Sequence, residues 1–441
     1  MSPADPATNP ALGSATGSAT DSATASAEET AGDPATEFLA DFNAATRRAR
    51  RRYVAAITLI TAATVATFLI IVARGEISHV SSRTAASAPA TVTAAPRSNP
   101  LTVAWRSDDA TAIGQPFFGG TVVTYSAHTV TGRDARTGSP RWTFTRTDRA
   151  LCSVIQESGK TQALYSAKGN CDELTTLDTG TGQRIQERTL DDEGNLVIGT
   201  PIVIPDSLAL TLATSTLVRT IRMSDGLNGW TYVAPAQCQN LRVVRGAAGV
   251  LISQHCTNGD YLLLRDLTAP DKSGDNPTDP VKWRIRTSAV VPAAADSFVA
   301  ALDSTTRTLI RYQPSNGSVL ATDTVLTPAP SPLRPVLQTE STNGELIWIG
   351  DTVYAVDTPG ARQVWSKPAS TLPTFSGPGT ATGSADLSTL ALPTSTGIAI
   401  LNPSSGAVTE SIAVNAPPAD SRIITVGSGF LVAASSTTVY K

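Results

Sequence analysis

Few residues in this chain of 441 have the types and spacing that chemistry requires. Its three histidines, His79, His128 and His255, belong to no metalloprotease, nucleophile-elbow, phosphate-loop or dinucleotide-binding motif. A Ser-His-Asp site assembles only in space, and three histidines give it few opportunities. We therefore expect no catalytic residues, no cofactor-binding residues and no cofactor. The sequence favours a protein that is not an enzyme without deciding the question.

Two acidic stretches offer oxygen atoms that could bind a metal ion. Asp271–Asp279 and Asp191–Gly194 are rich in carboxylates, but neither has the ligand spacing of a calcium-binding loop. We interpret both as solvated loops and expect no metal site.

The four cysteines, Cys152, Cys171, Cys238 and Cys256, are the remaining candidates. They show no CxxC or histidine-rich spacing of the kind that binds zinc. An even number of cysteines favours disulfides formed in an oxidising compartment. Which cysteines meet depends on the elements that carry them.

The composition favours a sheet protein with many turns. Aromatic residues make up 5% and charged residues 16% of the chain, while Ala, Thr, Ser and Gly are abundant. The net charge of -3 argues against a nucleic-acid partner, which requires a concentrated basic face.

The first hundred residues predict a tail, a membrane anchor and a linker. Residues 1–46 contain acidic residues but no Lys or Arg, and their small polar composition predicts a disordered tail. Residues 53–73 consist of Tyr53 and the twenty uncharged residues Val54–Ala73, enough to cross a hydrocarbon core of roughly 30 Å. Residues 74–100, rich in Ser, Ala, Thr and Pro, predict a flexible tether.

Five arginines between positions 47 and 52 precede the apolar segment. The positive-inside rule then places the N-terminus in the cytoplasm and the rest of the chain outside. The alternative is a cleaved signal peptide, but no small-residue cleavage site follows a short apolar core. We favour an uncleaved single-pass signal anchor that contacts the lipid bilayer through Val54–Ala73.

Residues 101–441 repeat one hairpin, which is clearest at Thr129–Thr145. The turn glycines Gly138, Gly182 and Gly226 are 44 residues apart, and further turn glycines follow at intervals of 91, 43 and 46. A period in the forties with several short strands predicts a β-propeller. The first four-stranded blade is expected at Gly114–Phe118, Thr121–Tyr125, Thr129–Asp134 and Arg141–Thr145.

Counting the last strand of each repeat gives seven blades. The residues that mark them, several of them tryptophans expected to pack between neighbouring sheets, are Trp142, Ile185, Trp230, Trp283, Leu320, Trp365 and Val408. Three C-terminal strands then lack a fourth, and Leu101–Arg106, with Trp105, supplies it. Such a closure removes open sheet edges. We therefore predict an all-β fold with eight blades, and seven as the alternative.

The blade assignment also pairs the cysteines. Cys152 and Cys238 open the first strand of a blade, and Cys171 and Cys256 are expected at or just past the end of the second strand. The start of one antiparallel strand faces the end of the next. We therefore predict the disulfides Cys152–Cys171 and Cys238–Cys256.

The hairpin resembles the pyrroloquinoline-quinone-like (PQQ-like) repeat propellers, whose units end in D-x-x-T-G-x-x-x-W. The segment Asp134–Trp142 carries this pattern nearly whole, and Asp178–Gly182 and Val353–Asp357 carry parts of it. The resemblance implies the propeller fold. The family includes quinone-dependent dehydrogenases and the outer-membrane assembly lipoprotein BamB, a binding scaffold. This chain has no lipobox cysteine near its anchor and so departs from BamB there.

These observations together favour an extracytoplasmic propeller that serves as a protein-interaction scaffold in the cell envelope, with an envelope protein or a cell-wall polymer as its partner. A quinone-dependent dehydrogenase and a cell-wall carbohydrate-binding module are the alternatives. A hydrolase is a further one, which serine-directed probes would label.

Overall fold

The computed structural model describes residues 79–90 and most of residues 100–441, together with helical residues between positions 46 and 65. The longest gaps in the second region are 191–200, 268–280, 328–336 and 376–389. Two compact units are present, residues 1–74 and residues 75–441. The predicted acidic loops at Asp191–Gly194 and Asp271–Asp279 and the predicted tail before residue 46 lie outside the described residues.

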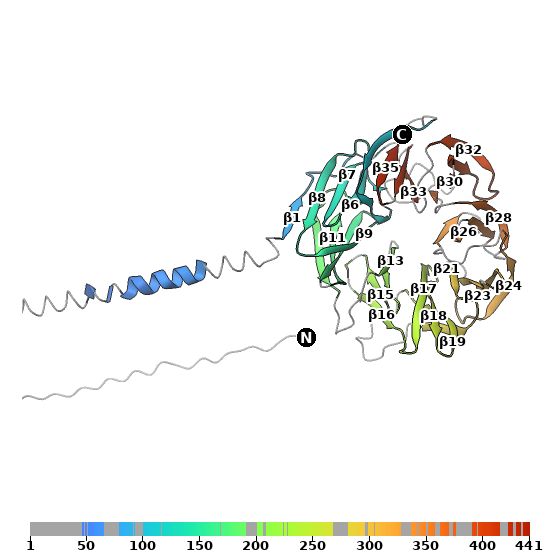
Figure 1. Ribbon diagram of the computed structural model, residues 1–441, viewed down its shortest axis with the longest axis horizontal. Coiled ribbons are helices and arrows are strands. Elements are labelled where there is room, and N and C mark those ends of the chain that lie inside the picture. The colour runs from blue at the N-terminus through green and yellow to red at the C-terminus, as the bar shows by residue number, and fades with distance from the viewer. Residues whose placement is uncertain are drawn as a thin grey trace, which may run out of the picture. The chain divides into compact units, whose positions relative to one another are not determined.

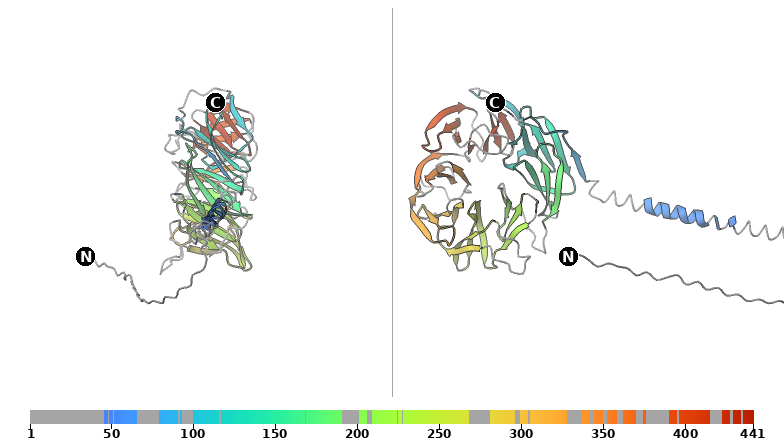
Figure 2. Two further views of the ribbon diagram at one scale, coloured as in Figure 1. Left: turned by 90° about the vertical axis from the view of Figure 1, so that its left-hand side faces the viewer. Right: turned by 180° about the vertical axis from the view of Figure 1, so that it is seen from behind.

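Eight antiparallel sheets follow one another around a ring, as the fold prediction required (Figure 1). Seen edge-on, the ring is a thin disc (Figure 2). In the first four blades the strands are β3 (Ala110–Thr111), β5 (Phe117–Phe118), β6 (Thr121–Tyr125), β7 (Thr129–Asp134) and β8 (Pro140–Arg146); β9 (Ala150–Glu157), β10 (Lys160–Ala167), β11 (Asn170–Asp178) and β12 (Arg184–Thr189); β13 (Ile202–Pro205), β14 (Ala209–Ala213), β15 (Leu217–Arg222) and β16 (Asn228–Val233); and β17 (Cys238–Gly246), β18 (Gly249–Cys256), β19 (Gly259–Arg265) and β20 (Val281–Arg286).

The next three blades have the same order of four strands from the axis to the rim. They are β21 (Val291–Ala295), β22 (Val299–Asp303), β23 (Thr308–Tyr312) and β24 (Val319–Val325); β25 (Leu337–Ser341), β26 (Gly344–Ile349), β27 (Thr352–Asp357) and β28 (Gln363–Pro368); and β29 (Thr374–Phe375), β30 (Leu390–Thr394), β31 (Gly397–Leu401) and β32 (Val408–Ala413).

The eighth blade joins the two ends of the propeller, which confirms the predicted closure. Its strands are β33 (Arg422–Val426), β34 (Gly429–Ala433), β35 (Thr437–Tyr440) and β2 (Val103–Ser107). The strand β2 pairs antiparallel with β35, and Trp105 lies opposite Val439. The closure leaves no unpaired first or last blade.

The inner part of the first blade differs from the prediction of one strand at Gly114–Phe118. Two short strands, β3 and β5, pair with β6 instead, and between them β4 (Ile113–Gly114) pairs in parallel with β9 of the second blade. The glycine Gly114 has φ of 86°, a conformation that breaks a continuous strand.

Tryptophans lock neighbouring blades together, as expected from the sequence. Trp142 is fully buried, and its indole Nε1 donates a hydrogen bond of 2.8 Å to the Thr179 carbonyl in the next blade. The turn glycine Gly182 of that blade lies against the same indole, so close that a Cβ there would come within 2.5 Å of the ring. An indole hydrogen bond to a backbone carbonyl of the next blade is also donated by Trp105, Trp230, Trp283 and Trp365.

A β-bulge just before the docking residue aims it at the next blade. In β8 the residue left unpaired at the bulge is Arg141, and in β12 it is Ile185. Gln186, not Ile185, therefore occupies the tryptophan position of blade 2, and it lies against Gly226. The same one-residue shift places Ala321 rather than Leu320 at this position in blade 5, and in blade 7 the position falls at Glu410, two residues after Val408.

The linker expected at residues 74–100 contains a strand. Val80–Arg83 forms β1, which pairs antiparallel with the outer strand β8 of the first blade. Beyond β1, Ala85 N donates a hydrogen bond to the Thr181 carbonyl in the turn between β11 and β12. The Arg141 side chain donates a hydrogen bond to the Ser87 carbonyl. Composition did not reveal this strand, because β1 is held mainly by backbone bonds to an edge, with Val80 as its one apolar side chain packed against the core.

The N-terminal unit contains an exposed helix at residues 52–65. No described helix is both long enough and apolar enough to span a bilayer. The predicted segment Val54–Ala73 extends beyond the described part of that helix, which ends at residue 65.

Candidate functional site: a charged groove at the rim of blades 1 and 2

A fully buried arginine stands at the end of β8, between the first two blades. Trp142, Phe144 and Arg146 alternate along this strand, so they point to the same side, toward blade 2. Trp142 and Phe144 join the hydrophobic core between the blades, which includes Tyr165. The guanidinium of Arg146 continues this row and lies 5.6 Å from the centroid of the Tyr165 ring.

Three carboxylates compensate the buried charge of Arg146. Asp148 accepts two hydrogen bonds from its guanidinium, at 3.1 and 3.2 Å, and Glu187 of β12 accepts one at 2.7 Å. Glu173 of β11 forms a further ion pair with Arg146 Nη1. A buried ion needs such a complete set of partners, because a single unpaired charge would be strongly destabilising.

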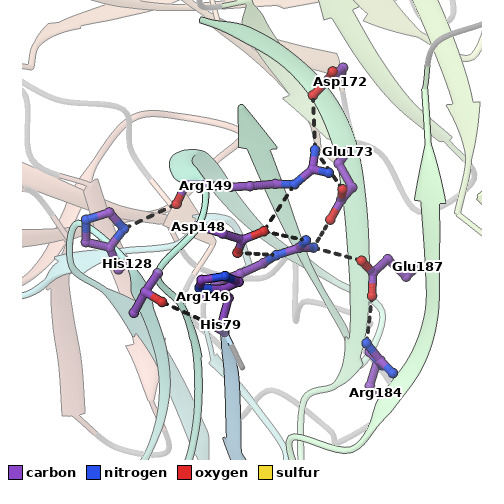
Figure 3. A network of polar contacts seen from close by, with 10 residues as sticks. His79, His128, Arg146, Asp148, Arg149, Asp172, Glu173, Arg184 and Glu187 are labelled. Atoms are coloured by element: carbon purple, nitrogen blue, oxygen red, sulfur yellow. Dashed lines mark hydrogen bonds and ion pairs between the residues drawn. The ribbon is translucent and has the colours of Figure 1, made fainter. Parts of the chain in front are cut away.

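Two further arginines, Arg149 and Arg184, pair with the same carboxylates (Figure 3). Arg149, in the connection from β8 to β9, lies 2.8 Å from Glu173 Oε2 and 3.8 Å from Asp172 Oδ1. Arg184, at the start of β12, donates to Glu187 Oε2 at 2.7 Å. In Figure 3 the side chains of Arg149 and Arg184 lie at opposite ends of the network, with Glu173 and Glu187 between them.

Burial and the charge of Arg146 shift the pKa values of two side chains beside it, Asp148 and Tyr165. Burial alone would raise the pKa of Asp148, but the hydrogen bond and charge of Arg146 outweigh it and lower that pKa below its usual value. Burial raises the pKa of Tyr165, so its phenol stays neutral beside the arginine. Asp148 is therefore ionised and Tyr165 neutral at neutral pH.

A groove of about 630 Å³ runs beside the outer strand β12. Its lining consists of Arg149, Glu173 and all six residues of β12. Its cations are more exposed than its anions: the Arg184 side chain is 49% exposed against 20% for Glu187, and that of Arg149 is 25% exposed against 4% for Glu173. We call this feature the β12 groove. It presents guanidinium groups at its surface over carboxylates that are already paired.

The structure confirms both disulfides, Cys152–Cys171 and Cys238–Cys256. Cys238 and Cys256 lie directly opposite each other in neighbouring strands, as predicted. Cys171, however, opens the third strand β11 and does not end the second. Cys152 falls at the irregularity where the pairing of β9 with β10 shifts, and its bond therefore links β9 to β11.

The three histidines do not come together. His128 Nδ1 lies 3.2 Å from the Arg149 carbonyl, and the His79 carbonyl accepts a hydrogen bond from Thr147 N. His255 pairs with Asp260 at 2.7 Å on an exposed turn. Within the described residues, no group of three His, Cys, Asp or Glu side chains could hold a metal ion.

The calcium ion of quinone-dependent dehydrogenases, the alternative that the family resemblance implies, requires a set of oxygen ligands. Within the part of the chain that the structure describes, the Arg146 network brings carboxylates together, and these carboxylates are bound by arginines. This donor set does not fit a calcium ion.

The β12 groove was not predicted from the sequence. Arg146, Glu173 and Glu187 lie far apart in sequence and converge only because two blades pack face to face. The one local signal was Arg146, a charged residue that follows Trp142 and Phe144 in the strand alternation, at a position expected to be buried.

Comparison with known proteins supports the fold. The profile of the family described as "Outer membrane protein assembly factor BamB" matches residues 272–440. This match and the eight blades confirm a PQQ-like repeat β-propeller. No curated protein matched the chain.

Solved structures similar to the chain have low sequence identity. BamB from Moraxella catarrhalis is 16% identical with a TM-score of 0.47, and the similarity covers 77% of this chain and 99% of that one. BBS1N in complex with ARL6DN is 14% identical with a TM-score of 0.41, and the similarity covers 78% of this chain and 97% of that one. A europium-containing methanol dehydrogenase is 11% identical with a TM-score of 0.43, and the similarity covers 77% of this chain and 86% of that one.

Proposed function

We propose that the protein is a single-pass membrane protein whose propeller lies outside the cytoplasm and serves as a non-catalytic protein-interaction scaffold of the cell envelope. The observation that carries the scaffold role is the match of residues 272–440 to a family described as an assembly factor. A closed ring of eight sheets supports that role, because it presents loops and strand edges on a frame with interlocked blades.

The anchor is proposed from the sequence. Val54–Ala73 contains twenty residues without a charge and is preceded by five arginines. By the positive-inside rule, these features support a cytoplasmic N-terminus. The helix at residues 52–65 is consistent with this proposal.

The disulfides support an extracytoplasmic location for the propeller. All four cysteines of the chain are paired, and both bonds lie in residues 101–441. Disulfides of this kind persist in oxidising compartments and are rare in the cytosol.

Topology is tested with two tagged versions of the full-length chain in whole cells whose outer envelope is permeable to protease. One tag precedes Met1 and the other follows Lys441. We expect external protease to remove the C-terminal tag and to spare the N-terminal tag until the membrane is lysed. Protection of both tags would contradict the proposed location.

The scaffold role is tested by crosslinking the full-length protein in its native membrane and identifying the crosslinked proteins. We expect one or a few envelope proteins to be recovered reproducibly. Recovery of cell-wall polymer alone, with no protein adduct, would replace the protein scaffold with a carbohydrate-binding module.

A further inference from the structure

The chain itself shows that a blade of this propeller accepts an additional strand. β1 pairs with β8 through Val80 opposite Arg146 and Arg83 opposite Thr143. These partners on β8 follow the docking residue Trp142 directly. The outer edge of a blade, just after its docking residue, is therefore a site at which an extended segment binds through its backbone.

The corresponding edge of blade 2 faces the β12 groove. Gln186 takes the place of Trp142, so the stretch Glu187–Thr189 corresponds to the part of β8 that β1 covers. Among the described residues, no strand pairs with the outer edge of β12. Consecutive residues of a strand point to opposite sides. A space lined by all six of them must therefore run along the edge of β12.

The charges of the groove define the chemistry of its occupant. Arg184 stands at the start of β12, and Arg149 contacts Glu173, which pairs with Thr189 near the end of β12. Arg184 and Thr189 are five residues apart, and the Arg184 guanidinium reaches toward Glu187, so the two guanidinium groups are separated by less than five residues of extended chain, at about 3.3 Å per residue. Two acidic side chains four residues apart lie on one side of an extended peptide and match this spacing.

An apolar contact lies near one of these charges. Ile185, the bulge residue of β12, is 53% exposed and lines the groove. Arg188, also in the lining, donates from Nε to the Asp225 carbonyl at 2.9 Å and so borders the groove on the side of blade 3. The groove therefore combines a backbone edge, three arginines (Arg149, Arg184 and Arg188) and one apolar side chain.

We propose that the β12 groove binds an extended peptide segment of a partner protein, which adds to blade 2 as a fifth strand and places two acidic side chains, four residues apart, against Arg149 and Arg184. The proposal deepens the scaffold function and rests on it, because it names the surface and the class of partner. Backbone pairing supplies affinity in this mode of binding, and the side chains supply selectivity.

The test uses the purified full-length protein in detergent and a fluorescent blocked peptide, Thr-Glu-Thr-Val-Thr-Glu-Thr, with binding followed by anisotropy. Two matched peptides carry Lys for both Glu residues or Pro for the central Val. We expect the Glu peptide to bind and both matched peptides to bind more weakly. Proline removes a backbone donor and cannot join a strand ladder.

The protein variants are Arg184→Glu and, as the matched control, Arg222→Glu. Both arginines form an exposed pair with an acid three residues later, but Arg222 lies on β15 outside the groove. Arg184→Glu should weaken the Glu peptide roughly fivefold and strengthen the Lys peptide, since cross-strand charge pairs are individually modest. Arg222→Glu should change neither.

Equal binding of the Glu, Lys and Pro peptides, or no binding of the Glu peptide at millimolar concentration, would overturn the inference. An unchanged affinity in Arg184→Glu, with the disulfides intact on a non-reducing gel, would also overturn it. The scaffold function is tested separately by crosslinking in the membrane. Partners that crosslink only away from β12 would contradict this inference and would still support the scaffold function.

Discussion

The close packing of Trp142 against the Gly182 turn of the next blade predicts that Gly182→Ala destabilises the propeller. Gly182 has φ of +72°, and a Cβ there would lie 2.5 Å from the Trp142 ring. An alanine in this left-handed conformation costs about 1–2 kcal/mol. Overpacking against the indole adds about 1–3 kcal/mol. We expect the free energy of unfolding of the propeller to fall by about 2–5 kcal/mol.

The matched control is Gly169→Ala. Gly169 has φ of +88°, but no atom lies within 4 Å of the position a Cβ would take. This variant should show only the conformational cost of about 1–2 kcal/mol. Urea unfolding of both full-length variants, followed by tryptophan fluorescence, measures the difference. Equal destabilisation by the two substitutions would refute the claim that close glycine–tryptophan contact locks the blades.

Four further outcomes follow from the structure. Deletion of β35 should open the ring, and limited proteolysis of the variant should then yield fragments where the intact chain resists. Replacing Cys152 and Cys171 together with serine should lower the free energy of unfolding by up to about 3 kcal/mol in urea titrations, because the disulfide closes a loop of separation 19. Arg146→Met should destabilise by up to about 3–5 kcal/mol because buried Glu173 then keeps only its ion pair with Arg149, and Arg146→Met with Glu173→Leu should recover most of that loss in the same assay. Burial alone would raise the pKa of Asp303, but hydrogen bonds from Ser288 and two backbone amides lower it. The stability that ionised Asp303 contributes is therefore present at neutral pH and lost as the pH falls below about 4. Asp303→Asn should lower the urea midpoint at pH 7 and reduce its dependence on acid pH.

The repeat could be predicted because it appears in local sequence. A turn glycine and a tryptophan recur at nearly fixed spacing, so the eight blades and the closing strand that carries Trp105 followed from the residues alone. The exact docking position did not follow where tryptophan is absent. A bulge shifts it by one residue, from Ile185 to Gln186, and bulges leave little trace in sequence.

The candidate site could not be predicted, because its parts meet only through the packing of two blades. Arg146, Glu173 and Glu187 come from three different strands, and β1 comes from a segment whose small polar residues favour a linker. Side-chain composition does not report that a backbone edge will be covered. Edge pairing therefore has to be seen in the structure.

The most direct test of the central claim places a photo-crosslinking amino acid in the full-length protein in its own membrane. The positions compared are Ile185 in the β12 groove and Val364 on β28, which are equivalent bulge residues, 53% and 54% exposed. We expect a discrete protein adduct from position 185 and little or none from position 364. The absence of a protein adduct at position 185, or equal adducts at both positions, would contradict a scaffold that engages its partner through blade 2.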